Sequence, residues 1–119
     1  MRNDGNTCLD QLKDDVLALC RRKGWGVDGI QDPQHVAMAM TVEMSELLEH
    51  FQWLNREDVV RLMEGRDPER TALIAEEFAD VMMYGLQLAH TLGFDITQQI
   101  LRKIDIVDHR PYNADEPAR

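Results

Sequence analysis

Apolar residues recur along this chain at spacings of three and four, and turn residues divide them into separate helical stretches. The first stretch runs from about Thr7 to Lys23, where Gly24-Trp25-Gly26 interrupts it. Asp32-Pro33 then supplies an N-cap residue followed by a proline at the first helical position. We expect a second helix from there to about Trp53. No alternation typical of strands and no internal repeat is found.

The same cap chemistry opens a third helix. Asp67-Pro68 precedes a long apolar pattern that reaches Leu92, and Gly93 ends it. Asp95, with Gln98 three residues later, resembles a capping box and predicts a fourth helix to about His109. Between the second and third helices, 57–63 predicts one short helical turn within a linker.

The third predicted helix is apolar around most of its circumference, which is typical of a buried helix. Four helices of one chain cannot cover it on every side, so we expect a second subunit to pack against it. The fold class is therefore all-α, a four-helix bundle assembled as a dimer or dimer of dimers. We expect one domain over 1–110 and a flexible tail over 111–119.

Composition excludes several classes of function. The 119 residues carry 13 Lys and Arg against 22 Asp and Glu, a net charge of −9, which argues against nucleic-acid polymers and anionic membranes as partners. Cys8 and Cys20 have no zinc-ligand spacing and indicate reduced thiols. From the polar start of the chain we expect no signal peptide, and no apolar run is long enough to span a membrane. We expect a cytoplasmic protein.

Two pairs of acidic residues interrupt the apolar helices. Glu43-x-x-Glu46 follows a run of apolar residues, and Glu77-x-x-Asp80 lies inside another. The spacing places each pair on one helical face, one turn apart. Buried carboxylates are costly without a counter-charge, and a hard divalent cation such as Mg²⁺, for which Mn²⁺ can substitute, is the natural one. The pattern predicts a metal-dependent enzyme.

Two other interpretations of the acids stay open. One is a solvated helical face, which the apolar flanks and the lack of Lys or Arg at pairing distance disfavour. The other is a di-iron bundle, which requires Glu-x-x-His on two helices. His50 and His90 do not stand at that spacing, and oxygen-only ligands favour Mg²⁺.

Three further residues are candidates for contact with substrate. Trp53 lies seven residues after Glu46 and could stack a base, or pack in a core or interface. Tyr84 lies four residues after Asp80, where its hydroxyl could reach a phosphate or simply be buried. By spacing alone, Lys103 is a surface lysine.

The acidic motifs resemble those of the MazG-like superfamily of all-α nucleoside triphosphate pyrophosphohydrolases. Glu43-Met-Ser-Glu46 and Glu77-Phe-Ala-Asp80 match its Glu-x-x-Glu and Glu-x-x-Asp marks. The fuller strings that extend to Phe51-Gln-Trp53 and to Tyr84 are most similar to the dCTP pyrophosphatase branch, as is Lys103-Ile-Asp-Ile106. The resemblance covers about 14–110.

The chain departs from that branch near the base pocket. Val107 stands where the branch carries Asn, Pro111-Tyr112 reverses the usual order, and Gln31 replaces a base-contacting His. The preferred base is therefore open.

The resemblance implies hydrolysis of a nucleoside triphosphate to the monophosphate and pyrophosphate, as house-cleaning of pyrimidine deoxynucleotides or modified nucleotides. It implies a homodimer or homotetramer, Mg²⁺ held by Glu43, Glu46, Glu77 and Asp80, and Gln31, Trp53, Tyr84 and Lys103 as substrate-binding residues. Glu46 is our candidate for orienting or deprotonating the water. A regulatory bundle that binds nucleotide without turnover is the alternative.

Overall fold

The chain folds into helices, as the sequence predicts. The computed structural model describes residues 1–111. In this range five helices follow one another: α1 (Leu9–Lys23), α2 (Pro33–Glu49), α3 (Arg56–Met63), α4 (Pro68–Leu92) and α5 (Ile96–Asp108). None of the helices in this range combines the length and apolar character needed to cross a membrane. The predicted flexible tail, apart from Pro111, lies outside the described residues.

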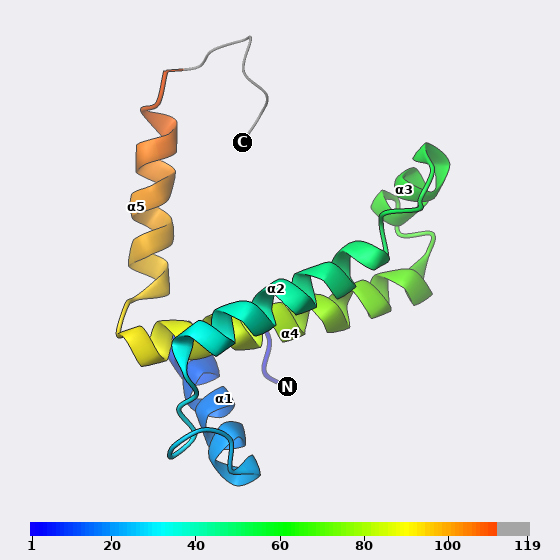
Figure 1. Cartoon of the computed structure of the whole chain (residues 1–119). Helices are drawn as coiled ribbons and strands as arrows, with labels where there is room; N and C mark the ends of the chain where they lie inside the picture. Colours follow the sequence, from blue (N-terminus) through cyan, green and yellow to red (C-terminus); the bar gives the residue numbers. More distant parts are fainter. Residues whose placement is uncertain (112–119) are drawn as a thin grey trace.

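The centre of the fold is a hairpin of two long antiparallel helices. α2 and α4 lie side by side along their length, and the short α3 connects them at the far end of the hairpin (Figure 1). α1 crosses α4 at the opposite end. α5 begins there too, and extends away from the hairpin. The hairpin therefore carries the two acidic motifs on neighbouring helices.

The predicted caps set where both hairpin helices begin. The Asp32 carboxylate accepts hydrogen bonds from the backbone N–H of Gln34 and of His35, at 2.8 and 3.3 Å. The Asp67 carboxylate accepts one from the backbone N–H of Arg70 at 3.2 Å. In both helices a proline follows the cap, where its missing N–H costs no hydrogen bond.

The connection between the hairpin helices differs from the prediction. α2 ends at Glu49 instead of continuing to Trp53, and residues 50–53 form turns. The expected single helical turn is instead the eight-residue α3. Asn55 and Asp58 form a reciprocal capping box at its start, each side chain accepting from the backbone N–H of the other. This local signal nucleates a helix at a length where propensity alone would not.

The buried core is small and lies where α1 crosses the hairpin. Val16 and Cys20 of α1 pack with Leu86 of α4. Val36 and Ala89 are the other buried apolar residues in the described range. Cys8 and Cys20 are both free thiols, as expected.

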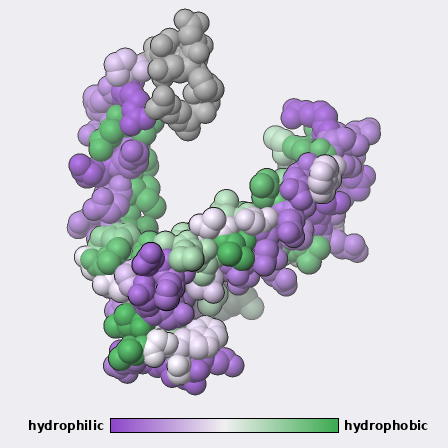
Figure 2. All heavy atoms as spheres, viewed as in Figure 1, coloured by the Kyte–Doolittle hydropathy of each residue, from purple (hydrophilic) through white to green (hydrophobic). Residues whose placement is uncertain are grey.

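One chain does not bury the apolar surface of α4 and α5. Leu73 and Phe78 of α4 keep 50% and 55% of their surface exposed, although the sequence predicts a buried helix. On α5, Ile100 and Ile104 are 53% and 58% exposed. Figure 2 shows apolar side chains along the length of α5. The residues that the structure describes therefore leave these apolar faces uncovered.

Candidate metal centre

The hairpin brings carboxylates from α2 and α4 to one place. One oxygen each from Glu43, Glu77 and Asp80 lies within 4.8 Å of the other two. Two oxygens on opposite sides of an octahedral Mg²⁺ are roughly 4 Å apart, because each bond is about 2.1 Å long. The three side chains are thus spaced so that small adjustments would let them share one divalent cation.

Two atoms of this cluster lack partners. Oε2 of Glu43 and Oε2 of Glu77 are buried and accept no hydrogen bond. Buried carboxylate oxygens are almost always paired or bound to a metal, because desolvation is costly. Asp80, by contrast, is exposed and closes the cluster on the solvent side. A hard divalent cation fits this donor set, since all three donors are carboxylate oxygens.

The acids also perturb one another. Burial, contact with Glu46 and the negative charges around it raise the pKa of Glu43 to about 7. Burial and the charge of Glu46 raise the pKa of Glu77. Both shifts mean that burial first, and the neighbouring negative charges second, disfavour the charged forms of these carboxyls. A bound cation would favour these charged forms instead.

Glu46 lies beside the cluster. It is half-buried, and its carboxyl contributes to the raised pKa of both Glu43 and Glu77. Its oxygens are not part of the tight group of three. The structure therefore brings all four predicted acids together but separates Glu46, on the edge, from the three that converge.

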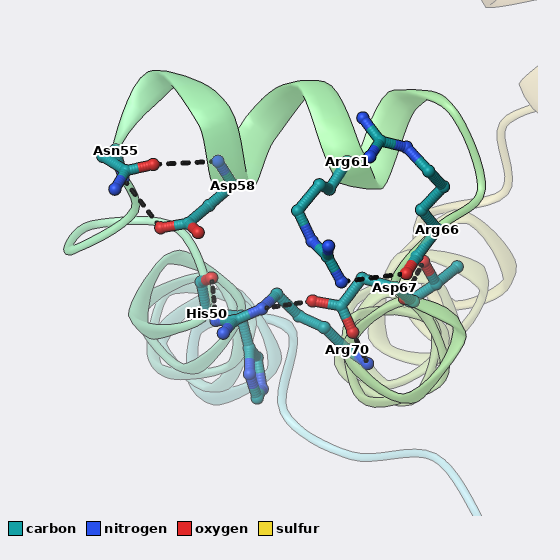
Figure 3. A network of polar contacts seen from close by, with 8 residues as sticks. His50, Asn55, Asp58, Arg61, Arg66, Asp67 and Arg70 are labelled. Carbon is teal, nitrogen blue, oxygen red and sulfur yellow. Dashed lines mark hydrogen bonds and ion pairs between the residues drawn. The ribbon is translucent and has the colours of Figure 1, made fainter.

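A histidine beside the cluster was missed by the sequence analysis as a neighbour of the acids. Nε2 of His50 lies 3.9 Å from Oε1 of Glu77. Arg70 donates from Nη1 to the backbone carbonyl of His50 at 3.4 Å and from Nε to Oδ2 of Asp67 at 3.1 Å (Figure 3). Because α2 and α4 run antiparallel, His50 is far in sequence from both Arg70 and Glu77. The only available signal was His50 itself, on the acidic helix but off the di-iron spacing.

Two predicted substrate-binding residues belong to the hairpin and its approach. Tyr84 is half-buried on α4, one turn after Asp80. Gln31 precedes α2, and its Nε2 donates to Oε1 of Gln87 on α4 at 2.8 Å. Gln87 is seven residues, or two turns, beyond Asp80. Gln31 therefore lies further along the hairpin, about two turns of α4 away from the acids, and not among them.

The other two lie outside the hairpin. Trp53 follows the end of α2 and is 86% exposed. Because α2 ends four residues before Trp53, the spacing of seven residues from Glu46 does not place Trp53 on the helical face of that glutamate, and the expectation of a helix to about Trp53 is wrong. Lys103 lines an open groove of ≈ 420 Å³ on α5, together with Ile100, Ile104, Val107 and Asp108. Within one chain, neither residue is part of the acidic cluster.

Comparison with known proteins identifies a matching family and several relatives. The family model of the MazG-like family matches residues 38–116. Human dCTP pyrophosphatase 1 is 34% identical over 82 residues, which cover 69% of this chain and 46% of the human protein. Mouse dCTP pyrophosphatase 1 is 32% identical over 73 residues, or 61% of this chain and 42% of the mouse protein. The chain thus spans about half the length of the curated relatives it matches.

A solved structure has the same fold. The crystal structure of a pyrophosphatase from Archaeoglobus fulgidus superposes with a TM-score of 0.71 and covers 91% of this chain and 95% of that chain. The two sequences are 24% identical. At that identity the similarity establishes the fold alone.

Proposed function

Because the chain belongs to the MazG-like family, we propose that it is a divalent-metal-dependent nucleoside triphosphate pyrophosphohydrolase. The observation that carries the proposal is the convergence of Glu43, Glu77 and Asp80 around two buried, unpartnered oxygens. Surface acids need no such convergence. The relatives named dCTP pyrophosphatase support the same reaction class.

In this proposal Glu43, Glu77 and Asp80, with Glu46 beside them, hold Mg²⁺ or its substitute Mn²⁺. When bound, the cation neutralises charge on the phosphates. Glu46 holds the attacking water and accepts its proton on a carboxylate oxygen. The water oxygen bonds to the α-phosphorus, the bond from that phosphorus to the bridging oxygen breaks, and pyrophosphate leaves.

The remaining predicted residues bind substrate. Tyr84 directs its hydroxyl to a phosphate, and Lys103 contributes a positive charge. Trp53 stacks the base and Gln31 contacts its edge. Pyrimidine deoxynucleotides are the proposed substrates, dCTP-like ones first, with modified nucleotides as house-cleaning targets. Action on the nucleotide pool would place the protein in the cytoplasm.

Assembly as a homodimer or homotetramer is part of the proposal. The exposed apolar side chains of α4 and α5 support it, because such surface is costly to leave in water. A second copy could also bring Trp53 and Lys103 to an acidic cluster that they do not reach in their own chain.

The test is pyrophosphate release from normal and modified nucleoside triphosphates. We expect Mg²⁺-dependent turnover that EDTA abolishes and Mg²⁺ or Mn²⁺ restores. Glu77→Gln should lower turnover by at least ~100-fold, as for loss of a group that stabilises the transition state. Glu76→Gln is the matched control, since Glu76 is the exposed neighbour of Glu77.

Two results would contradict the proposal. Full activity in excess EDTA would show that the reaction needs no metal. An active Glu77→Gln enzyme would show that the acidic residues have a structural role only. Nucleotide binding without turnover would instead favour the regulatory bundle. A di-iron oxidase would show iron and visible absorbance after purification.

A further inference from the structure

The two oxygens of the Glu77 carboxylate have different surroundings. Oε1 lies 3.9 Å from Nε2 of His50, whereas Oε2 is buried without a partner. We propose that His50 is a positioning residue for Glu77: a small movement of the Glu77 side chain would bring Oε1, now 3.9 Å from Nε2, to hydrogen-bonding distance of the ring, and would leave Oε2 for the cation. The inference rests on the proposed metal centre and adds a residue to it.

His50 is itself held in place from both helices. It caps the C-terminus of α2, and its backbone N–H donates to the Leu47 carbonyl at 3.2 Å. Its own carbonyl accepts from Arg70 of α4, which also bonds Asp67. Figure 3 shows the carbonyl of His50 directed at Arg70, with the ring at the other end of the residue. Arg70 thus fixes the backbone from which the ring reaches Glu77.

The register of the hairpin explains why one residue, His50, can contact both Arg70 and Glu77. Arg70 and Glu77 are seven residues apart on α4, so both lie on the same face, two turns apart. His50 lies against the interval between them: its carbonyl contacts one and its ring approaches the other. The tie between His50 and Arg70 therefore also sets the register at which Glu43 of α2 meets Glu77 of α4.

A donor that orients Glu77 has a chemical advantage over a strong counter-charge. Metal-ligating carboxylates are commonly hydrogen-bonded by a neighbouring group that sets their direction. A lysine or arginine at this place would neutralise the cluster and compete with the cation. Among the described residues, His50 is the one basic residue that pairs with any of the four acids, and no Lys or Arg does so. His50 is also outside the group of converging ligand oxygens, which suits a role through Glu77.

The test measures Mn²⁺ affinity without nucleotide, by electron paramagnetic resonance of free Mn²⁺ at fixed pH. His50→Leu should raise the Mn²⁺ Kd by about 10- to 100-fold, the usual effect of losing such a partner. His50→Gln keeps an amide donor and should raise the Kd less. His35→Leu is the control, because His35 is exposed on the same helix, at its other end. Excess Mg²⁺ should restore kcat of His50→Leu, which a merely structural defect would not allow.

The outcomes separate this inference from the proposed function. If the wild-type protein binds no Mn²⁺, both fail. If the wild type binds and His50→Leu binds equally well, only the positioning role is overturned. Should the leucine variant lose its helical circular dichroism, His50→Phe, which keeps a flat ring without a donor, replaces it with the same expectation.

Discussion

At the scale of single residues, the acidic cluster opposes the stability of the metal-free fold. Glu43 and Glu77 are protonated more readily here than in water, because burial and neighbouring carboxylates disfavour their charged forms. Natural proteins keep such arrangements where function requires them. The unfavourable burial of these carboxylates should therefore be measurable as a pH dependence of stability in the absence of any ligand.

The first prediction is a pH dependence of stability in EDTA. The pKa of Glu43 is about 7 in the folded chain against 4.5 as an ordinary carboxyl, so between these values the native state binds more protons than the unfolded state. The contribution of Glu43 to the unfolding free energy is therefore fully present below about pH 4.5 and falls as pH rises through 7. Glu43→Gln should gain Tm relative to wild type as the pH goes from 5 to 8.

Thermal melts of both proteins across this range check the prediction. Glu49→Gln, an exposed glutamate on the same helix, is the control and should melt in parallel with wild type. Parallel curves for Glu43→Gln as well would mean that the cluster is solvated.

The sequence predicts those parts of the site in which the contacts lie within one helix. The pairs Glu43–Glu46 and Glu77–Asp80 could be predicted because each spans one turn within an apolar stretch. The contact between His50 and Glu77 crosses two antiparallel helices and depends on their register. Spacing along a single helix carries no information on that register.

At the scale of elements, local chemistry fixes a helix boundary where a cap residue marks it, as Gly24 and Gly93 mark the ends of α1 and α4. The Asp-Pro pairs predicted the starts of α2 and α4 to the residue, because cap and proline act through their own backbone. The end of α2 coincides with a tertiary contact, in which Arg70 of α4 donates to the carbonyl of His50. That carbonyl is thereby satisfied outside the helix, and the chain turns toward α3 at a point that no local residue marks.

The turn after α2 gives the second prediction. Trp53 is exposed there, and stacking a base is worth about 1–3 kcal/mol, so Trp53→Ala should raise KM by roughly 5- to 150-fold. Mn²⁺ affinity should stay unchanged, because Trp53 lies outside the acidic cluster. The measurement is KM over several triphosphates, with Trp25→Ala, in the loop before α2, as the control. Unchanged KM values would make Trp53 a packing residue.

At the scale of the whole molecule, the chain buries little and exposes much apolar surface. Its buried apolar residues in the described range are five: Val16, Cys20, Val36, Leu86 and Ala89. α5 extends away from the hairpin with its apolar residues uncovered (Figures 1 and 2). The fold class could be predicted from periodicity, because helical patterning is local. The arrangement of α5 could not, because α5 makes few contacts with the other described helices.

The last prediction is that the chain associates with itself through α5 and the hairpin. The groove at Ile100, Ile104 and Val107 is apolar and open, and burying an isoleucine stabilises by about 1.5–3 kcal/mol. A charge at its centre should therefore oppose association strongly. Light scattering at micromolar concentration should give at least twice the 13.8 kDa mass of one chain for wild type, and a lower mass for Ile104→Asp.

The control adds the same charge on the same helix outside the groove. Gln98→Asp should keep the wild-type mass, because Gln98 is an exposed polar residue that does not line the groove. Since the chain carries a net charge of −9, repulsion between copies opposes association, and added salt should favour the larger species. A wild-type protein with the mass of one chain at every salt concentration would show that the apolar surface of α5 serves something other than a second copy.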